Sequence, residues 1–281
     1  MAEERIPLIE TVDLKKYFKV GDKSYLHAVD GINMKVYPGE TIGVVGESGC
    51  GKSTLGRTIL RLIEPTSGQI LYNGEDITKL NARQMKRMRQ ELQIIFQDPY
   101  ASLDPRKSVI EIIAEYMIIN KTLPTKREIY NRAAHLMDVV GLARRYATAY
   151  PHELDGGRRQ RIGIARALSV NPKFIVCDEP VSALDVSIQA QILNLLMDLQ
   201  DEMGLTYMFV THDLSVVKHI SNNIVVMYLG QCLEFATSDE LFASPVHPYT
   251  KALLSAIPEP DISMRNKEIK VIKGEVASPV D

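Results

Sequence analysis

The chain of 281 residues predicts an α/β fold, and three observations point to it. Residues 41–45, 174–177 and 206–210 are short apolar runs, typical of strands that are buried on both faces. Helical patterns separate these runs, as expected for strands that lie parallel in one sheet. A glycine-rich stretch stands between the first run and a helix, so we expect the core to be organised around it.

The glycine-rich stretch fits the phosphate-binding pattern G-x-x-x-x-G-K-[ST], which requires a strand before it and a helix after it. Its members are Gly46, Glu47, Ser48, Gly49, Cys50, Gly51, Lys52, Ser53 and Thr54. Glycines let backbone N–H groups approach phosphate oxygens closely, and the N-terminus of a helix favours negative charge. We expect Lys52 to reach the β- and γ-phosphates of a nucleotide and Ser53 to bind Mg²⁺. The alternative is a glycine-rich turn with a chance lysine.

The composition argues against several other classes of protein. The formal net charge is −2, which leaves no basic footprint for nucleic acid and no polybasic membrane anchor. Cys50, Cys177 and Cys232 are far apart in sequence, which favours a reducing compartment over a disulfide framework. No apolar run approaches the roughly 18 residues that span a bilayer, and the charged N-terminus is unlike a signal peptide. We therefore expect any membrane role to come through a partner.

The elements around the glycine-rich stretch are predicted from alternation and from helix-breaking residues. Residues 8–18 and 28–37 alternate apolar and polar side chains, as half-buried strands do, and a polar turn separates them. The helix after the stretch is expected at 54–63, because Pro65 cannot continue it.

Turn and capping residues predict the next elements. Residues 69–77 are expected to form a hairpin around Asn73-Gly74, the favoured two-residue turn. Asn81 is a good N-cap for a helix at 82–91, and a short strand is expected at 93–96.

From residue 98 to residue 166 the pattern is helical. Residues 108–120 and 126–140 carry apolar side chains at three- and four-residue spacing, and Gly141 is expected to end the second helix.

After the strand at 174–177, a helix is expected at 186–203, ended by Gly204. Strands at 224–228 and 231–235 complete the sheet. Two short helices are expected in the tail, at 239–242 and 249–257.

These elements suggest three parts. Residues 1–97 and 167–235 form a nucleotide-binding core with an antiparallel β subdomain. Residues 98–166 form a helical subdomain inserted into that core, and residues 236–281 form a C-terminal extension. We find no internal repeat.

Acidic residues follow the apolar run at 174–177. Asp178 ends that strand, where a carboxylate associated with Mg²⁺ belongs, and Glu179 is then placed to orient or deprotonate water. The alternative is an acidic turn at a strand end, and the upstream phosphate-binding pattern argues against it.

Gln97 and His212 also follow strands and could contact Mg²⁺ and the γ-phosphate, although a lone Gln or His at a strand end is more often merely polar.

A second pair of glycines precedes a helix that is expected to reach Leu168. The sequence from 155 to 160 is Asp-Gly-Gly-Arg-Arg-Gln. Gly156 and Gly157 are candidates for a second phosphate cradle, and the alternative is a helix start with Asp155 as its N-cap.

In this order, the motifs resemble those of the ATP-binding cassette (ABC) ATPases over nearly the whole chain. Residues 97–106 (QDPYASLDPR) and 247–261 (HPYTKALLSAIPEPD) resemble the ATPase subunits of oligopeptide, dipeptide and nickel importers. The resemblance implies a P-loop NTPase core and an ATPase at the cytoplasmic face of the membrane. It also implies two membrane permeases, a second ATPase subunit and an external solute-binding protein as partners, with no nucleic acid.

The resemblance also implies roles for individual residues. Lys52, Ser53 and Thr54 would bind phosphate and Mg²⁺, with Gln97 and Asp178 as further metal ligands. Glu179 would be the catalytic base and His212 the switch histidine, while Asp185 would lie in the D-loop. An aromatic residue before the second strand would stack on adenine; Phe18 is our choice and Tyr17 the substitute.

Two departures from the family pattern affect these expectations. The family signature is L-S-G-G-Q, whereas this chain has Leu-Asp-Gly-Gly-Arg at 154–158. A serine would donate a hydrogen bond to the partner's γ-phosphate, whereas an ionised Asp155 is an acceptor with negative charge. Unless Asp155 is protonated or paired with Arg158, sites built from two such signatures would be weak. We therefore expect a heterodimer with a partner that carries an ordinary signature, and low ATPase activity for the chain alone.

The second departure is at the C-terminus. Chains of this group usually continue past 274–281 (GEVASPVD) into a cysteine-containing segment, so whether the native chain extends beyond Asp281 stays open. Three other functions remain open: a nickel or oligosaccharide importer ATPase, a soluble cassette ATPase acting on DNA or ribosomes, and a largely non-hydrolytic regulatory cassette.

Overall fold

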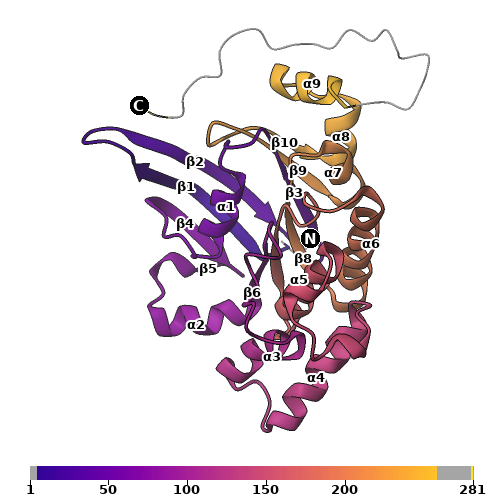
Figure 1. Cartoon of the computed structure of the whole chain (residues 1–281). Coiled ribbons are helices and arrows are strands. Elements are labelled where there is room, and N and C mark those ends of the chain that lie inside the picture. The colour runs from indigo at the N-terminus through magenta and orange to yellow at the C-terminus, as the bar shows by residue number, and fades with distance from the viewer. Residues whose placement is uncertain (1–4, 258–279, 281) are drawn as a thin grey trace, which may run out of the picture. The chain divides into compact units, whose positions relative to one another are not determined.

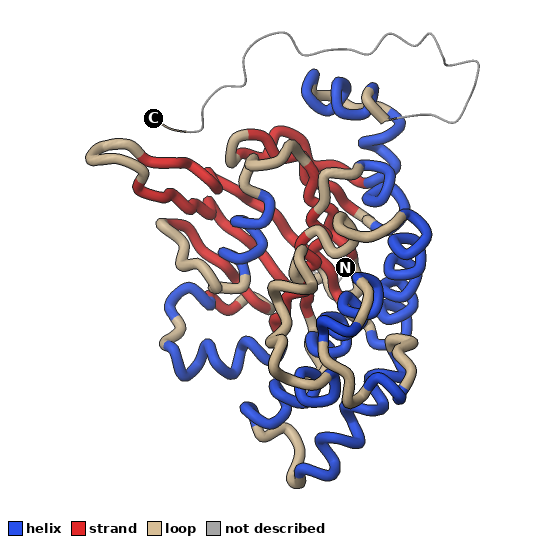
Figure 2. The backbone as a smooth tube through the Cα atoms, viewed as in Figure 1, coloured by secondary structure: helices blue, strands red, loops and turns tan. Residues whose placement is uncertain are grey.

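The computed structural model describes residues 5–257 and residue 280, which pack into two compact units (Figure 1). The first unit extends to Lys79 and resumes at Met208, and the second unit comprises Leu80–Tyr207. Both units contain strands and helices (Figure 2), as the predicted α/β fold requires.

An antiparallel sheet in the first unit has the strand order β2-β1-β4-β5. Its strands are β1 (Ile9–Lys19), β2 (Tyr25–Val36), β4 (Ser67–Tyr72) and β5 (Glu75–Asp76). Asn73 and Gly74 both have positive φ, so the predicted turn between β4 and β5 is confirmed. β2 starts at Tyr25 rather than at residue 28, because it pairs with β1 as far as Lys19.

The strand that leads into the phosphate loop, β3 (Thr41–Val45), is buried along its whole length. It pairs in parallel with β9 (Asn223–Tyr228), and β9 pairs antiparallel with β10 (Gln231–Thr237). β8 (Thr206–Val210) lies on the other side of β3, and the chain passes from the second unit into the first within β8. Just after β8, the Thr211 N–H donates to the Val44 carbonyl at 3.1 Å. The C-terminal ends of β3 and β8 therefore lie at the same edge of the sheet.

The helix after the phosphate loop, α1 (Lys52–Ile59), ends four residues before the predicted end. Arg61 has a left-handed φ of 49°, and the Leu62 N–H donates to the Arg57 carbonyl at 2.9 Å. This is a Schellman arrangement, in which glycine usually occupies the position of Arg61. The Arg61 guanidinium donates to the Ile77 carbonyl at 2.7 Å, a tertiary contact that no local sequence pattern predicts.

Among the residues that the structure describes, the first unit has three further helices. They are α7 (Leu214–Ile220), α8 (Ser238–Ala243) and α9 (Pro248–Ser255), with a short 3₁₀ turn at Ile77–Lys79. The two tail helices were predicted, and α7 was missed because seven residues are too few for clear periodicity. The Asp213 side chain accepts from the Ser215 N–H at 2.8 Å and caps α7. Buried side chains from these helices and from the sheet form one cluster: Val45, Leu214, Val217, Ile224, Val226, Leu241 and Tyr249.

The second unit contains two parallel strands, β6 (Leu92–Ile95) and β7 (Phe174–Asp178). Its helices are α2 (Ala82–Glu91), α3 (Val109–Asn120), α4 (Lys126–Val139), α5 (Gly156–Leu168) and α6 (Val186–Met203), with 3₁₀ turns at Arg144–Tyr146 and Pro151–Glu153. Helices α3, α4 and α5 pack against one another (Figure 1). This agrees with the helical character predicted for residues 98–166.

Three predicted helix boundaries in the second unit are confirmed. The Asn81 side chain accepts from the Gln84 N–H at 3.0 Å, and the Gln84 Oε1 accepts from the Asn81 N–H at 2.9 Å. Gly141 and Gly204 have φ of 68° and 62°, the left-handed conformation that ends a helix.

The predicted domain boundaries stay predictions. Residues 98–166 lie within the second unit, whereas the predicted core contributes to both units. The C-terminal extension predicted from residue 236 begins inside β10, and its part after residue 257 lies outside the described residues except for Val280. In the part of the chain that the structure describes, no helix has the length and apolar character needed to cross a bilayer.

Candidate nucleotide-binding site

The phosphate loop, residues 46–51, joins β3 to α1 and has glycines where a side chain has no room. Gly46 and Gly51 have φ of 152° and 105°. A Cβ on Gly51 would lie 1.9 Å from the Ala28 carbonyl oxygen, and one on Gly46 would lie 2.2 Å from that of Met227. The loop backbone packs directly on β2 and β9, so its shape depends on both glycines.

Lys52 is only 4% exposed and lies within the curve of this loop. Its Nζ donates to the carbonyl oxygens of Gly46 and Glu47, each at 2.7 Å. These carbonyls are neutral, so a phosphate oxygen would be a stronger partner for the ammonium group. The predicted phosphate-binding lysine is therefore placed where a phosphate inside the loop would meet it.

The first turn of α1 offers backbone amides to the same place. Its N-cap residue, Gly51, has no side chain that could occupy them. Ser53 and Thr54 lie half-buried in this first turn. Helix N-terminal amides favour an anion, so the loop and α1 together fit the phosphates of a nucleotide.

Cys50 connects the phosphate loop to the turn between β9 and β10. Its carbonyl accepts a hydrogen bond from the Gly230 N–H, in the turn between β9 and β10, at 2.9 Å. The side chain is 4% exposed, and burial raises the pKa of the Cys50 thiol. The residue therefore serves the loop as a neutral packing group.

His212 lies at the same edge of the sheet as the phosphate loop. It follows Thr211, whose N–H pairs with β3, and it precedes Asp213, the cap of α7. Its side chain is exposed. Within the first unit, the structure thus brings the predicted switch histidine to the edge at which the phosphate loop begins.

Phe18 and Tyr17 lie on β1 next to the part of β2 that borders the loop. Phe18 pairs with Leu26, two residues before the Ala28 carbonyl that faces Gly51. The Tyr17 ring stacks on His27 with 4.0 Å between ring centroids, and its hydroxyl is 2.5 Å from an Asp30 oxygen. Phe18 is half-buried with the Lys16 ammonium 4.9 Å from its ring centroid. The assignment of adenine stacking to Phe18 stays a prediction.

In the second unit, Gln97 and Glu179 meet. The Gln97 Nε2 donates to the Glu179 Oε2 at 2.9 Å. The register of the parallel strands explains the contact, because Ile95 pairs with Cys177, and Gln97 and Glu179 each lie two residues after one member of that pair. Asp178 is fully buried at the end of β7, and Glu179 has a left-handed φ of 46° that turns the chain away from the strand. The three predicted residues at these strand ends are therefore neighbours.

The glycine pair at the start of α5 has a packing role. A Cβ on Gly156 would lie 3.0 Å from a Leu184 methyl, and one on Gly157 would lie 2.7 Å from an Ile188 methyl. The glycines thus allow α5 to approach the start of α6, at Asp185, where the D-loop is predicted.

Asp155 is the N-cap of α5. Its Oδ1 accepts from the Arg158 N–H at 2.8 Å, and its Oδ2 pairs with the Arg158 guanidinium at 2.5 Å. Of the arrangements considered from the sequence, the structure contains the salt bridge to Arg158. The Arg158 guanidinium offsets part of the negative charge of Asp155, so Asp155 should weaken this site less than an unpaired carboxylate would, while the expected heterodimer stays untested.

One residue near the loop was missed. The Tyr249 hydroxyl accepts a hydrogen bond from the Glu47 N–H at 3.2 Å. The only sequence signal was its place in the stretch HPYT, which pointed to a family and not to a contact.

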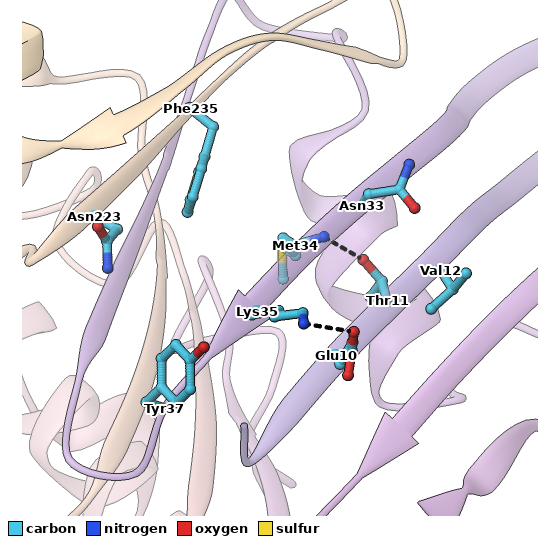
Figure 3. A pocket seen from close by; sticks show the side chains of 9 residues that line it. All are labelled: Glu10, Thr11, Val12, Asn33, Met34, Lys35, Tyr37, Asn223 and Phe235. Carbon is cyan, nitrogen blue, oxygen red and sulfur yellow. Dashed lines mark hydrogen bonds and ion pairs between the residues drawn. The ribbon is translucent and has the colours of Figure 1, made fainter. Parts of the chain in front are cut away.

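The first unit also has a hollow of about 550 Å³ that is separate from the phosphate loop (Figure 3). Its residues come from β1, β2, the turn after β2, β9 and β10: Glu10, Thr11, Val12, Asn33, Met34, Lys35, Tyr37, Asn223 and Phe235. Asn223 pairs with Ile42, at the start of β3, whereas the phosphate loop follows the end of that strand. The hollow is thus at the opposite edge of the sheet.

Comparison with known proteins agrees with these features. Residues 29–182 match the family model described as ABC transporter, and residues 233–281 match the oligopeptide/dipeptide transporter C-terminal region. The oligopeptide transport ATP-binding protein OppF of Bacillus subtilis is 53% identical over 264 residues, which cover 94% of this chain and 86% of the relative. OppF of Escherichia coli is 48% identical over 290 residues, covering 100% of this chain and 87% of the relative.

Among solved structures, a dimeric post-hydrolysis state of the ATP-binding cassette MJ0796 bound to ADP and Pi is similar. Its TM-score is 0.74 at 28% identity, over 82% of this chain and 98% of that one. The phosphate loop with its enclosed lysine, the paired Gln97 and Glu179, and these matches lead to one conclusion. The chain belongs to the ABC transporter family and is one of its ATPases.

Proposed function

We propose that this chain is the ATP-binding and ATP-hydrolysing subunit of an importer that takes up oligopeptides or dipeptides. The observation that carries the proposal is the match of residues 233–281 to the C-terminal region of oligopeptide/dipeptide transporters. The two OppF relatives support it, because they are oligopeptide transport ATP-binding proteins that are 53% and 48% identical to this chain over nearly its full length.

In the first unit, Lys52 and the amides of the loop would hold the phosphates. The ammonium would exchange its two carbonyl partners for phosphate oxygens, and the first turn of α1 would add amides. The Ser53 hydroxyl would contribute to a Mg²⁺ site, and Phe18 would stack on adenine. His212 would contact the γ-phosphate from the end of β8.

In the second unit, Asp178 and Gln97 would contribute oxygen atoms for Mg²⁺, and Glu179 would orient and deprotonate water. When bound, Mg²⁺ neutralises the charge that develops on the phosphates. The hydrogen bond from Gln97 holds one oxygen of Glu179 in a fixed orientation, which suits a general base. Glu179 is also half-buried, which limits the directions in which its carboxylate can turn.

The remaining parts of the proposal concern partners. We propose that the chain works at the cytoplasmic face of the membrane with two permeases, a second ATPase chain and, indirectly, a solute-binding protein. MJ0796, a similar cassette, is dimeric, which supports pairing of two cassettes.

The loop from Gln97 to Arg106 is our proposed permease contact. Tyr100 is 53% exposed, and the Arg159 guanidinium lies 4.9 Å from its ring centroid. Arg106 pairs with Asp104 on the surface. We expect Tyr100→Ala to impair uptake while leaving hydrolysis in place, because an exposed aromatic side chain supplies contact area to a partner.

The test is ATP hydrolysis and peptide uptake in vesicles that contain the assembled transporter. Glu179→Gln keeps the size of the side chain and removes its basicity, so hydrolysis should fall by about 10²–10⁴-fold with nucleotide binding retained. Uptake of a labelled oligopeptide should stop with it. Uptake of Ni²⁺ instead of peptide, or hydrolysis at the parent rate in the variant, would contradict the proposal.

A further inference from the structure

The C-terminal helix α9 is bonded directly to the phosphate loop. Tyr249 lies in the first turn of α9, and its hydroxyl accepts from the Glu47 N–H, 202 residues away in sequence, at 3.2 Å. Glu47 is the first residue of the loop after Gly46, and its carbonyl accepts from the Lys52 Nζ. Both polar groups of the Glu47 backbone are therefore engaged, one by α9 and one by the phosphate-binding lysine.

The start of α9 is itself held in place. The Glu234 carboxylate, on β10, accepts from the N–H groups of Val246 at 2.7 Å and His247 at 3.0 Å. The His247 Nδ1 then accepts from the Tyr249 N–H at 3.1 Å and caps the helix. The hydroxyl of Tyr249 is thus positioned by a series of bonds that starts in the sheet and not by the ring alone.

The Tyr249 ring is fixed as well. It is 5% exposed and lies in the buried cluster that includes Val45 at the end of β3. The Tyr228 ring packs against it with 4.8 Å between ring centroids. Burial raises the pKa of Tyr249 to about 12, so the group stays neutral at physiological pH and accepts a hydrogen bond without placing an anion beside the loop.

We propose that Tyr249 is a positioning residue for the phosphate loop, and this inference rests on the proposed ATP binding. When Lys52 leaves the Glu47 carbonyl for a phosphate, the bond from Glu47 N–H to Tyr249 remains. It holds the first residue of the loop while the later amides face the nucleotide. The C-terminal region that marks the peptide importers is, by this bond, part of the nucleotide site.

The test compares nucleotide affinity in the full chain, titrated with a fluorescent ATP analogue. Tyr249→Phe keeps the ring and removes the acceptor, which leaves the Glu47 amide without its partner. We expect affinity to fall by about tenfold, which corresponds to about 1.4 kcal/mol. Tyr228→Phe is the matched control, because it removes a hydroxyl from the neighbouring ring and leaves the Glu47 bond intact; its affinity should equal that of the parent.

Two further measurements separate positioning from mere packing. In the assembled transporter, Tyr249→Phe should raise the KM for ATP by about tenfold and change kcat by less than about twofold, since the lost bond affects binding. Hydrogen exchange of the peptide that contains residues 46–52 should be faster in Tyr249→Phe, with other peptides of the first unit unchanged.

The outcomes are distinct. If the parent chain binds the analogue and Lys52→Ala does not, ATP binding stands. If Tyr249→Phe then binds as tightly as the parent, with unchanged exchange in the loop, the inference about Tyr249 is wrong. If the parent chain itself fails to bind, the proposed function is wrong.

Discussion

Helices α1 and α5 both begin after glycines, but they use their first amides in different ways. The N-cap of α1 is Gly51, and the Lys52 ammonium in its first turn is held by loop carbonyls. The N-cap of α5 is Asp155, whose carboxylate occupies the Arg158 N–H and pairs with the Arg158 guanidinium. The N-cap of α1 supplies no carboxylate to its first turn, whereas the N-cap of α5 supplies one.

The difference shows what makes a glycine-rich helix start a phosphate site. Amides and the helix dipole are present in both, so they do not distinguish the two. The N-cap residue does distinguish them, because the Asp155 side chain satisfies an amide of α5 whereas Gly51 has no side chain that could do so at α1. A phosphate at α5 has to compete with a carboxylate or approach beside it, while at α1 it meets amides and a lysine.

The largest expected effect comes from a side chain at Gly51. Gly51→Ala forces a Cβ to within 1.9 Å of the Ala28 carbonyl at a φ of 105°, and we expect it to destabilise the fold by about 3 kcal/mol or more. Urea denaturation measures this. The matched control is Gly163→Ala in α5, where a Cβ meets no atom within 4 Å and stability should change by less than about 1 kcal/mol. Equal effects of the two substitutions would contradict the crowding argued for the loop.

The next effect concerns the charge in the loop. Lys52→Ala should lower affinity for an ATP analogue by about 10- to 100-fold, because hydrogen bonds to charged groups contribute about 1.5–3 kcal/mol. Lys35→Ala serves as the control, since this lysine lies in the separate hollow and pairs with Glu10 (Figure 3). An unchanged affinity in Lys52→Ala would contradict the argument that phosphate binds at the start of α1.

A smaller effect is expected at the start of α5. Asp155→Ser keeps an N-cap oxygen and removes the negative charge, so ATP hydrolysis by the isolated chain should rise by about threefold to tenfold. Arg158→Gln removes the cation that neutralises Asp155, and hydrolysis should fall. Turnover of ATP by the purified chain at several protein concentrations measures both. If the parent chain dimerises on ATP and hydrolyses it as fast as Asp155→Ser, the carboxylate does not limit this site.

The smallest effect is on stability. Asp155→Ala removes the cap and should lower the free energy of unfolding by about 1 kcal/mol, whereas Asp155→Ser should lower it by only a few tenths. The exposed pair with Arg158 should add little in physiological salt. Denaturation with urea, monitored by circular dichroism, distinguishes the two variants. A loss of several kcal/mol in Asp155→Ala would mean that the carboxylate has a structural partner other than its own helix.

Much of this protein is determined by local sequence. The phosphate loop lies between β3 and α1 as predicted, and Asn81, Gly141 and Gly204 mark helix boundaries. The turn at Asn73-Gly74 is likewise confirmed. Each of these features depends on the conformational freedom or hydrogen bonding of a few adjacent residues, so a pattern of adjacent residues suffices to predict it.

Other features were decided only by the tertiary structure. α1 is followed by a left-handed non-glycine residue, Arg61, whose guanidinium donates to the carbonyl of Ile77. Gln97 reaches Glu179 across 82 residues because β6 and β7 pair in one register. The Glu47 N–H reaches Tyr249 across 202 residues because β10 and α9 place the hydroxyl beside the loop. Such contacts depend on strand register and on the packing of distant segments, and neither is encoded in the residues adjacent to the contact.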